Sequence, residues 1–400
     1  MVRKAIEGVP PVGNRLAGMT EAPEVRLDAV VLPGQAGIYT LILRDGVVAT
    51  IEPSIGADPR WVGLPGLVNL HAHADRAFAV ASFRAASLAD ALAAAAKARA
   101  AFTAADVRMR ARRFFEHSIA HGATRVRTHT DVDAVVELRS MEGVLGAKRD
   151  VAEQLDVEVI AFATSRNDLA HPHGLGRLER AVELKPDLLG ASLNSSAEPK
   201  RALDALLDLA EQHGLPVDLH IDEHLDPARM LALMAADTVI ARGMQGRVSF
   251  SHLCALAAMD ESSAKALIDK IARAQITVIA LPETNLLLQD RGHATPRRRG
   301  ITLVRELIAA GVKVRLGTDN VRDWFFPFGD GDMLETARLG AITAHLDDTS
   351  QLVSAICGGC ALLEEGMPGD LVLIPATSLD DALARRPAGR LVFKSGRRIV

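Results

Sequence analysis

Eight short apolar runs alternate with longer amphipathic stretches between residues 66 and 317, and this alternation constrains the fold more than any other feature. The amphipathic stretches have the periodicity of helices, and glycines follow several of them, where a helix often ends in a left-handed residue. The expected helices include 105–121, 139–155, 200–213 and 261–274, and the expected strands are 66–70, 124–128, 157–163, 188–193, 216–220, 247–251, 276–280 and 312–317.

Strands that alternate with helices along a chain form a parallel sheet, because each crossover helix returns the chain to the same end of the sheet. Eight such strands predict an α/β fold, a (β/α)8 barrel of the TIM type. An open, doubly wound sheet is the alternative. It gains no support from the sequence, since no G-x-G-x-x-G turn follows any of the eight runs.

Both flanks of this region have the character of β-structure. Residues 25–62 contain short β-prone runs with an Asp45-Gly46 turn, and residues 369–400 contain further runs with a Ser395-Gly396 turn. We expect the two flanks, 25–64 plus 362–400, to pair in one small β-sandwich domain beside a barrel of residues 65–361. Residues 1–24 carry Pro and Gly with little periodicity and are expected to form an N-terminal arm.

The charge balance argues against nucleic acid and anionic membranes as partners. The 400 residues hold 46 Lys and Arg against 50 Asp and Glu, a net charge of -4. Residues 1–16 lack the apolar core of a secretory signal, and no stretch approaches the roughly 20 apolar residues of a membrane span. Because three cysteines suit a reducing compartment, we expect a cytoplasmic protein. From the charge balance and the lack of an apolar span, we expect a small-molecule substrate and no nucleic-acid or membrane partner.

Residue types that bind metals stand at the carboxyl ends of several predicted strands. In a (β/α)8 barrel these ends meet on one face, so residues far apart in the sequence can share one site. His71 and His73 point the same way on an extended chain because they are two residues apart. Imidazole and carboxylate groups suit zinc or ferrous iron, and an incomplete shell leaves a position for water. The candidates are His71, His73, His220, His252 and Asp319.

The short motifs around these residues resemble the amidohydrolase superfamily: H-x-H after the first strand, H-x-x-E after the fifth, S-H after the sixth and G-T-D after the eighth. Longer matches resemble its cytosine deaminase branch and run over most of residues 60–380. These segments are 71–78, 126–132, 218–223, 285–291, 297–302 and 317–323. The resemblance implies a metal-dependent hydrolase of carbon–nitrogen bonds other than peptide bonds.

In that branch one divalent metal ion, zinc or iron(II), is the cofactor. The resemblance assigns its four ligands to His71, His73, His220 and Asp319. Binuclear branches add a carboxylated lysine at the end of the fourth strand, but residues 188–195 contain no lysine. The resemblance therefore implies a single metal ion.

The resemblance also implies three catalytic roles. Glu223 protonates the ring nitrogen beside the attacked carbon and then assists the departure of the amine. His252, which is not a ligand in this branch, orients the attacking water and stabilises the developing oxyanion. Asp319 takes a proton from this water, whose pKa the metal lowers.

Two departures from cytosine deaminases concern recognition of the ring. Those enzymes place a glutamine just after the third strand, where this chain has Thr164-Ser165-Arg166, and they follow the metal-binding Asp with a second Asp, where this chain has Asn320. We expect a substrate other than cytosine, because a polar pocket discriminates strongly against a ring that leaves its groups unpaired. The expected substrate-binding residues are Thr164, Ser165, Arg166, His129, Asn320 and Trp324.

We therefore expect a hydrolytic deaminase of a small nitrogen heterocycle that forms a homo-oligomer and releases ammonia. A second hypothesis keeps the fold and the metal but hydrolyses a cyclic amide or an N-alkylamino-triazine. A third is a barrel without catalysis that serves as a binding protein, which the complete set of ligands disfavours. The Cys357/Cys360 pair and the His171/His173 loop stay unassigned.

Overall fold

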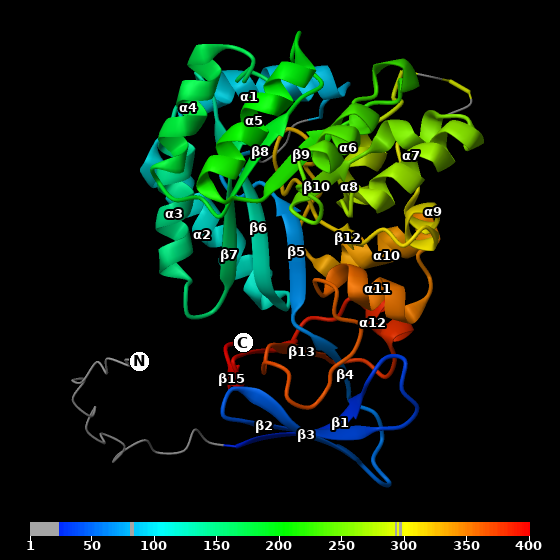
Figure 1. Ribbon diagram of the computed structural model, residues 1–400. Coiled ribbons are helices and arrows are strands. Elements are labelled where there is room, and N and C mark those ends of the chain that lie inside the picture. Colours follow the sequence, from blue (N-terminus) through cyan, green and yellow to red (C-terminus); the bar gives the residue numbers. More distant parts are fainter. Residues whose placement is uncertain (1–23, 81–83, 293, 296–297) are drawn as a thin grey trace, which may run out of the picture.

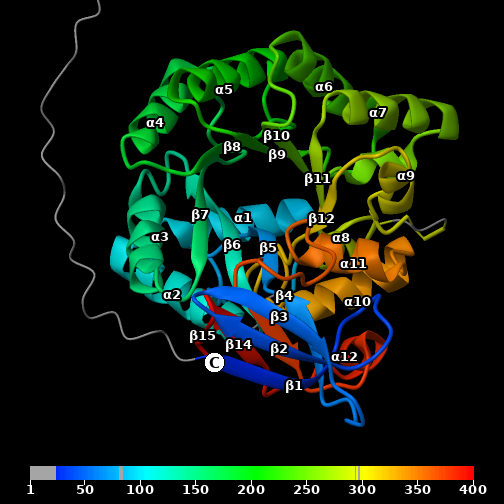
Figure 2. The ribbon, with the colours of Figure 1, turned by 60° about the horizontal axis from the view of Figure 1, so that its bottom comes forward.

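The computed structural model describes residues 24–80, 84–292, 294, 295 and 298–400 (Figure 1). Except for Glu24, the N-terminal arm expected for residues 1–24 lies outside this part of the chain, as does Arg297. The described residues form one sheet of eight strands and one of seven. Helices surround the eight-stranded sheet, and the seven-stranded sheet lies at one end of it (Figures 1 and 2).

The eight-stranded sheet is a parallel barrel, as the sequence predicts. Its strands pair in chain order from β5 to β12, and all seven pairings between neighbours are parallel. The barrel closes where Ala72 and Asp319 form a parallel bridge and the Asp319 N–H donates to the His71 carbonyl over 2.8 Å. The strands are β5 (Leu67–Ala72), β6 (Ala123–Val132), β7 (Asp156–Ala163), β8 (Leu188–Ser192), β9 (Val217–Ile221), β10 (Val248–His252), β11 (Thr277–Ala280) and β12 (Val314–Leu316).

Helices cover the outside of the barrel (Figure 2). At the start of α2 the Thr103 side chain accepts the Asp106 N–H, and α5 ends at the left-handed Gly214, as predicted. The helix expected over 139–155 ends at Asp150, because the chain continues in turns before it enters β7. None of the helices within the described residues is long and apolar enough to span a membrane. They are α1 (Leu88–Arg99), α2 (Ala104–Ala120), α3 (Arg139–Asp150), α4 (Pro172–Val182), α5 (Pro199–His213), α6 (Ala232–Ala241), α7 (Glu261–Arg273), α8 (Pro282–Leu288), α9 (Val304–Ala309), α10 (Met333–Ala344) and α11 (Thr349–Ile356), with the 3-10 turns η1 (Pro227–Arg229) and η2 (Cys254–Ala258).

The seven-stranded sheet joins the two flanks of the barrel. β13 pairs antiparallel with β4, where Val372 lies opposite Leu64, and β4 pairs in parallel with β1. The expectation that both flanks combine in one small β domain is confirmed. In sheet order the strands are β15 (Arg397–Arg398), β14 (Leu391–Lys394), β13 (Leu371–Ile374), β4 (Trp61–Pro65), β1 (Val25–Val31), β2 (Tyr39–Arg44) and β3 (Val47–Pro53), and α12 (Leu379–Arg385) lies between β13 and β14 in the chain.

The small β domain packs against the barrel through one face of its sheet. Side chains alternate along β13, so that Leu371 and Leu373 belong to a separate small core, whereas Val372 and Ile374 join the core of the barrel. β4 runs directly into β5, so the small domain lies at the amino ends of the barrel strands (Figure 1). The carboxyl ends of the strands, where the candidate ligands stand, therefore lie at the opposite end of the barrel.

Candidate active site

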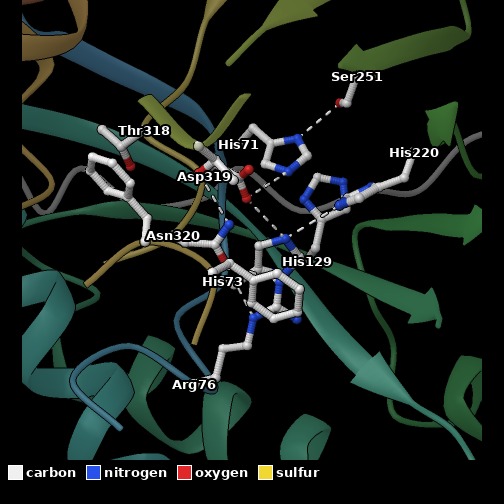
Figure 3. Close-up of polar contacts among 12 residues, drawn as sticks. His71, His73, Arg76, His129, His220, Ser251, Thr318, Asp319 and Asn320 are labelled. Atoms are coloured by element: carbon white, nitrogen blue, oxygen red, sulfur yellow. Dashed lines mark hydrogen bonds and ion pairs between the residues drawn. The ribbon is translucent and has the colours of Figure 1, made fainter. Parts of the chain in front are cut away.

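Three imidazoles and a carboxylate converge at the carboxyl ends of β5, β9 and β12 (Figure 3). The Nε2 atoms of His71 and His73 lie 3.5 and 3.3 Å from Asp319 Oδ1. His220, near the end of β9, places its Nε2 3.3 Å from Nε2 of His73. The structure thus brings together the four residues that the sequence predicts as metal ligands.

Burial leaves these four groups short of hydrogen-bond partners. All four side chains are buried, and neither carboxylate oxygen of Asp319 nor Nε2 of His71 has a hydrogen-bond partner among the described residues. A buried polar atom without a partner costs about 1–3 kcal/mol. Several such atoms that face one another are expected where a bound cation completes the group.

The protonation states of the cluster suit a cation. Burial, together with the nearby His129, lowers the pKa of His71 to about 3. Burial also holds the pKa of His73 and of His220 well below the ordinary range. Burial alone would raise the pKa of Asp319, but the imidazoles of His71 and His73 hold it well below its usual range. Neutral imidazoles and an ionised carboxylate offer lone pairs rather than protons, so this donor set fits a divalent metal ion.

Two further histidines adjoin the cluster. A ring nitrogen of His252, at the end of β10, lies within 4.8 Å of ligand atoms of His71 and Asp319. The Nε2 atom of His252 has no hydrogen-bond partner in the described part of the chain. His129, on β6, lies against His71 with ring centroids 4.0 Å apart, and its Nε2 bonds to Asp218 Oδ1. Each of these two histidines therefore has one hydrogen-bonded ring nitrogen, His252 Nδ1 with Asn285 and His129 Nε2 with Asp218. The other ring nitrogen of each has no partner among the described residues, and a nitrogen of His129 also lies within 4.8 Å of ligand atoms of His71, His73 and His220.

Glu223 lies on the loop after β9, beside this cluster. Its Oε1 is 3.8 Å from Nδ1 of His252, and the same nitrogen lies 3.1 Å from Asn285 Oδ1. The preceding Asp222 holds the loop in place, because its carboxylate accepts two backbone N–H groups from farther along it. Burial raises the pKa of Glu223, although its side chain remains 24% exposed, so it holds a proton more readily than a surface glutamate.

A cavity of about 470 Å³ lies over the cluster. It is lined by three of the four predicted metal ligands, His73, His220 and Asp319, but not by His71. The three residues with predicted catalytic roles, Glu223, His252 and Asp319, all line it, so a molecule bound there can contact each of them. The lining residues that the sequence analysis singled out are His73, His220, Glu223, His252, Asp319, Thr164, Ser165, Arg166 and Asn320.

Two predicted substrate-binding residues are not among the described residues that line this cavity. Trp324 is buried against Phe102, with ring centroids 6.4 Å apart, and the next residue, Phe325, lines the cavity. His129 is fully buried and is bonded to Asp218. The side chains of Trp324 and His129 therefore lie behind the residues that line the cavity.

Two buried arginines that the sequence analysis did not single out also line the cavity. Arg76 pairs with Asp131 at 3.3 Å and with Asp323 at 3.1 Å. Arg99, at the end of α1, pairs with Asp131 and Asp133. Arg76 belongs to the first motif of the resemblance, which is the signal that could have found it. Arg99 lies in an alanine-rich helix and carries no such signal.

Arg76 also sets the orientation of the Asn320 amide. Its Nε and Nη2 atoms lie 3.4 and 3.1 Å from Asn320 Oδ1, and a guanidinium group can only donate, so the amide oxygen must face it. The amide nitrogen donates one N–H to Thr284 Oγ1 at 3.2 Å. Asn320 lines the cavity, and its amide carries a second N–H donor, whereas an aspartate would offer only acceptors.

Known proteins are similar to this chain both in sequence and in fold. The Amidohydrolase family matches residues 179–400. A pterin deaminase from Rhizobium rhizogenes is 33% identical over 307 residues, which cover 74% of this chain and 70% of that protein. An N-isopropylammelide isopropyl amidohydrolase from Pseudomonas sp. is 26% identical over 409 aligned positions, which cover 93% of this chain and 94% of that protein.

Solved structures of similar fold come from proteins with related names. A 5-methylcytosine deaminase from Klebsiella pneumoniae liganded with 5-fluorocytosine superposes with a TM-score of 0.86 at 25% identity, covering 94% of this chain and 97% of that chain. An N-isopropylammelide isopropylaminohydrolase from Burkholderia multivorans gives a TM-score of 0.80 at 27% identity, with coverages of 94% and 98%. The chain belongs to the amidohydrolase family and is a hydrolase that acts on carbon–nitrogen bonds. The resemblance seen in the sequence is confirmed.

Proposed function

We propose that the protein is a metal-dependent hydrolytic deaminase of a nitrogen heterocycle. The observation that carries the proposal is that Glu223, whose pKa is raised, shares one cavity with a cluster of neutral imidazoles and an ionised carboxylate. Deamination needs groups that activate water and an acid that protonates the ring nitrogen. Relatives named as deaminases of pterin and 5-methylcytosine support the proposal.

The residues that would hold the metal are His71, His73, His220 and Asp319. We propose a single ion, zinc or iron(II), because β8 and the residues after it lack the lysine that bridges two metals in binuclear relatives. When bound, the ion lowers the pKa of a water molecule so that it ionises near neutral pH.

The side chains of the protein carry the proton transfers. Asp319 takes a proton from the attacking water, and both of its oxygens lack partners in the described structure. Glu223 gives its proton to the ring nitrogen, and the unpartnered Nε2 of His252 holds the oxygen at the attacked carbon. The proton on Asp319 passes to the amine, which leaves as ammonia. Glu223 recovers a proton from the hydroxyl group as the carbonyl forms, so the protein ends the cycle unchanged.

The proposed substrate is a ring larger than cytosine that presents a hydrogen-bond acceptor to Asn320. The cavity of about 470 Å³ offers more space than one six-membered ring fills. A fused, pterin-type ring with an amino group and a carbonyl oxygen meets both conditions, and a pterin deaminase is among the relatives. Arg166, exposed on the wall, favours a ring with several carbonyl oxygens or an acidic substituent.

The second candidate function uses the same site to remove an alkylamine from an N-alkylamino-triazine or to open a cyclic amide. It is favoured by the relative named N-isopropylammelide isopropyl amidohydrolase, which matches 93% of the chain. The reactions differ in their products, because deamination releases ammonia, dealkylation releases an alkylamine, and ring opening releases neither.

A product assay across a panel of rings tests the proposal. Holoenzyme is given pterin, cytosine, isocytosine, an N-alkylamino-triazine, a creatinine-like ring and a cyclic ureide, and kcat/KM is measured with ammonia and amine detection. We expect ammonia as the product, with the pterin-type ring preferred over cytosine by tenfold or more. A tenfold preference for cytosine would contradict the substrate proposal. Alkylamine as the main product, or ring opening without ammonia, would favour the second candidate.

A further inference from the structure

Asp218 lies inside the barrel next to the predicted metal ligands, and no step of the proposed mechanism uses it. It precedes His220 by two residues on β9, so the two side chains point to the same side of the strand. Its carboxylate is fully buried. The groups around it are Ser251 Oγ and His129 Nε2, at 2.8 and 3.1 Å from Oδ1, and Ser249 Oγ and Arg127 Nη1, at 2.7 and 3.5 Å from Oδ2.

Ser251 connects this carboxylate to a predicted metal ligand. Its Oγ lies 2.8 Å from Asp218 Oδ1. The same Oγ lies 2.9 Å from His71 Nδ1 (Figure 3). A hydroxyl group has one proton, and a carboxylate can only accept it. The Ser251 proton therefore goes to Asp218, and the Ser251 oxygen accepts the N–H of His71 Nδ1. If Ser251 donated to His71 instead, two oxygens would stand 2.8 Å apart without a proton between them.

This chain of hydrogen bonds fixes the tautomer of His71. With the proton on Nδ1, the Nε2 atom keeps its lone pair, and Nε2 is the nitrogen that faces Asp319 at 3.5 Å. The opposite tautomer would direct an N–H into the cluster, where it would oppose a cation. We propose that Ser251 and Asp218 are positioning residues that hold His71 ready to bind the metal ion. This inference rests on the metal site of the proposed function and goes beyond its four ligands.

The replacement Ser251→Ala tests the inference, because it removes the link between Asp218 and His71. Ser249→Ala is the matched control, since Ser249 bonds to the same carboxylate at 2.7 Å but does not bond to His71 in the described structure. The measurement is the zinc dissociation constant, obtained by transfer of zinc from the purified holoenzyme to a chromophoric chelator. The Tm of the metal-free proteins reports any structural damage separately.

We expect Ser251→Ala to bind zinc about 10–100-fold more weakly, the usual effect of losing a group that orients a metal-binding histidine. Ser249→Ala should stay within about threefold of the parent, and the two metal-free variants should have similar Tm values. If the parent holds zinc and Ser251→Ala holds it equally well, the positioning role is wrong. Equal weakening by Ser249→Ala would also contradict it. A parent protein that binds neither zinc nor iron(II) would contradict the proposed metal site itself.

Discussion

Glu223 and Asp319 are two carboxyl groups in one cavity whose surroundings shift their pKa values in opposite directions. Burial raises the pKa of Glu223, whereas the imidazoles of His71 and His73 hold the pKa of Asp319 low against the effect of burial. One group therefore retains its proton while the other loses it, and such a pair can serve as acid and base at the same pH. Their roles differ because of their neighbours, although their chemical groups are alike.

Replacement of Glu223 by glutamine tests its role as the proton donor. We expect Glu223→Gln to keep the metal content of the parent, because Glu223 is not among the four predicted ligands. Turnover should fall by about 10²–10⁴-fold, the usual contribution of a positioned acid or base. Steady-state kinetics with ammonia detection, together with elemental analysis, measures both quantities.

The matched control for Glu223 is Asp226→Asn, a similar change on the same loop at an exposed residue that does not line the cavity. It should keep turnover close to that of the parent. Turnover of Glu223→Gln within a fewfold of the parent would show that another group donates the proton.

At the scale of the elements, the strands that bear the site end in unusual backbone conformations. Asp222 after β9, His252 at the end of β10 and Asp319 after β12 have φ values of 55°, 72° and 59°. Residues other than glycine rarely adopt this left-handed region, and a bulky side chain is strained there. Such conformations are frequent at functional sites, and in this chain they also occur away from the site, as at Lys185 and Gln275.

The proposal of a single metal ion rests on the residues at the end of β8. This strand ends at Ser192, and no lysine follows it before Pro199 starts α5. We therefore expect elemental analysis of fully active protein to give close to one equivalent of zinc or iron per chain. The replacement His220→Ala should reduce this value, because it removes one of the four predicted ligands. Two equivalents at full activity would contradict the single-metal site.

The sequence predicts the eight barrel strands well because strands buried on both faces are continuous apolar runs. β6 is the exception, since it extends to Val132, four residues beyond the prediction. His129, Thr130 and Asp131 are polar yet fully buried, so hydrophobicity does not reveal them as a strand.

The wall of the cavity could be predicted only in part. The sequence identified four residues of the wall because they stand at strand ends where cytosine deaminases carry other residues: Thr164, Ser165, Arg166 and Asn320. Arg76 and Arg99 were missed because their pairing depends on partners far along the chain: Asp131 is 55 residues from Arg76 and Asp323 is 247. No local pattern shows such a contact. The cytoplasmic location and the homo-oligomeric state stay predictions.

At the scale of the whole molecule, a buried ion pair ties the small β domain to the barrel. Arg390 donates to both carboxylate oxygens of Asp332, and neither side chain is more than 5% exposed. Removing one partner of such a pair leaves an uncompensated buried charge, which costs about 3–5 kcal/mol. We expect Arg390→Ala to lower the free energy of unfolding by about 3 kcal/mol, measured by urea denaturation.

The matched control is Lys265→Ala, which removes an exposed pair with Asp269 on α7. Exposed pairs contribute at most about 1 kcal/mol, so this variant should unfold close to the urea midpoint of the parent. Equal stability of the Arg390 variant and the parent would show that apolar packing alone holds the small domain in place.

The pairing of β4 with β13 also affects how the protein folds during its synthesis. Residues 62–65 leave the ribosome about 300 residues before 371–374, an interval of about 15–60 s at 5–20 residues per second. For that time β4 has β1 as a partner on one edge and an unpaired edge on the other, and the apolar side chains Val62 and Leu64 lack the neighbours that β13 supplies. Exposed apolar surface and unpaired strand edges favour aggregation. The nascent chain is therefore most vulnerable to aggregation while the barrel is being synthesised, and this vulnerability ends when residues 371–374 emerge and close the sheet.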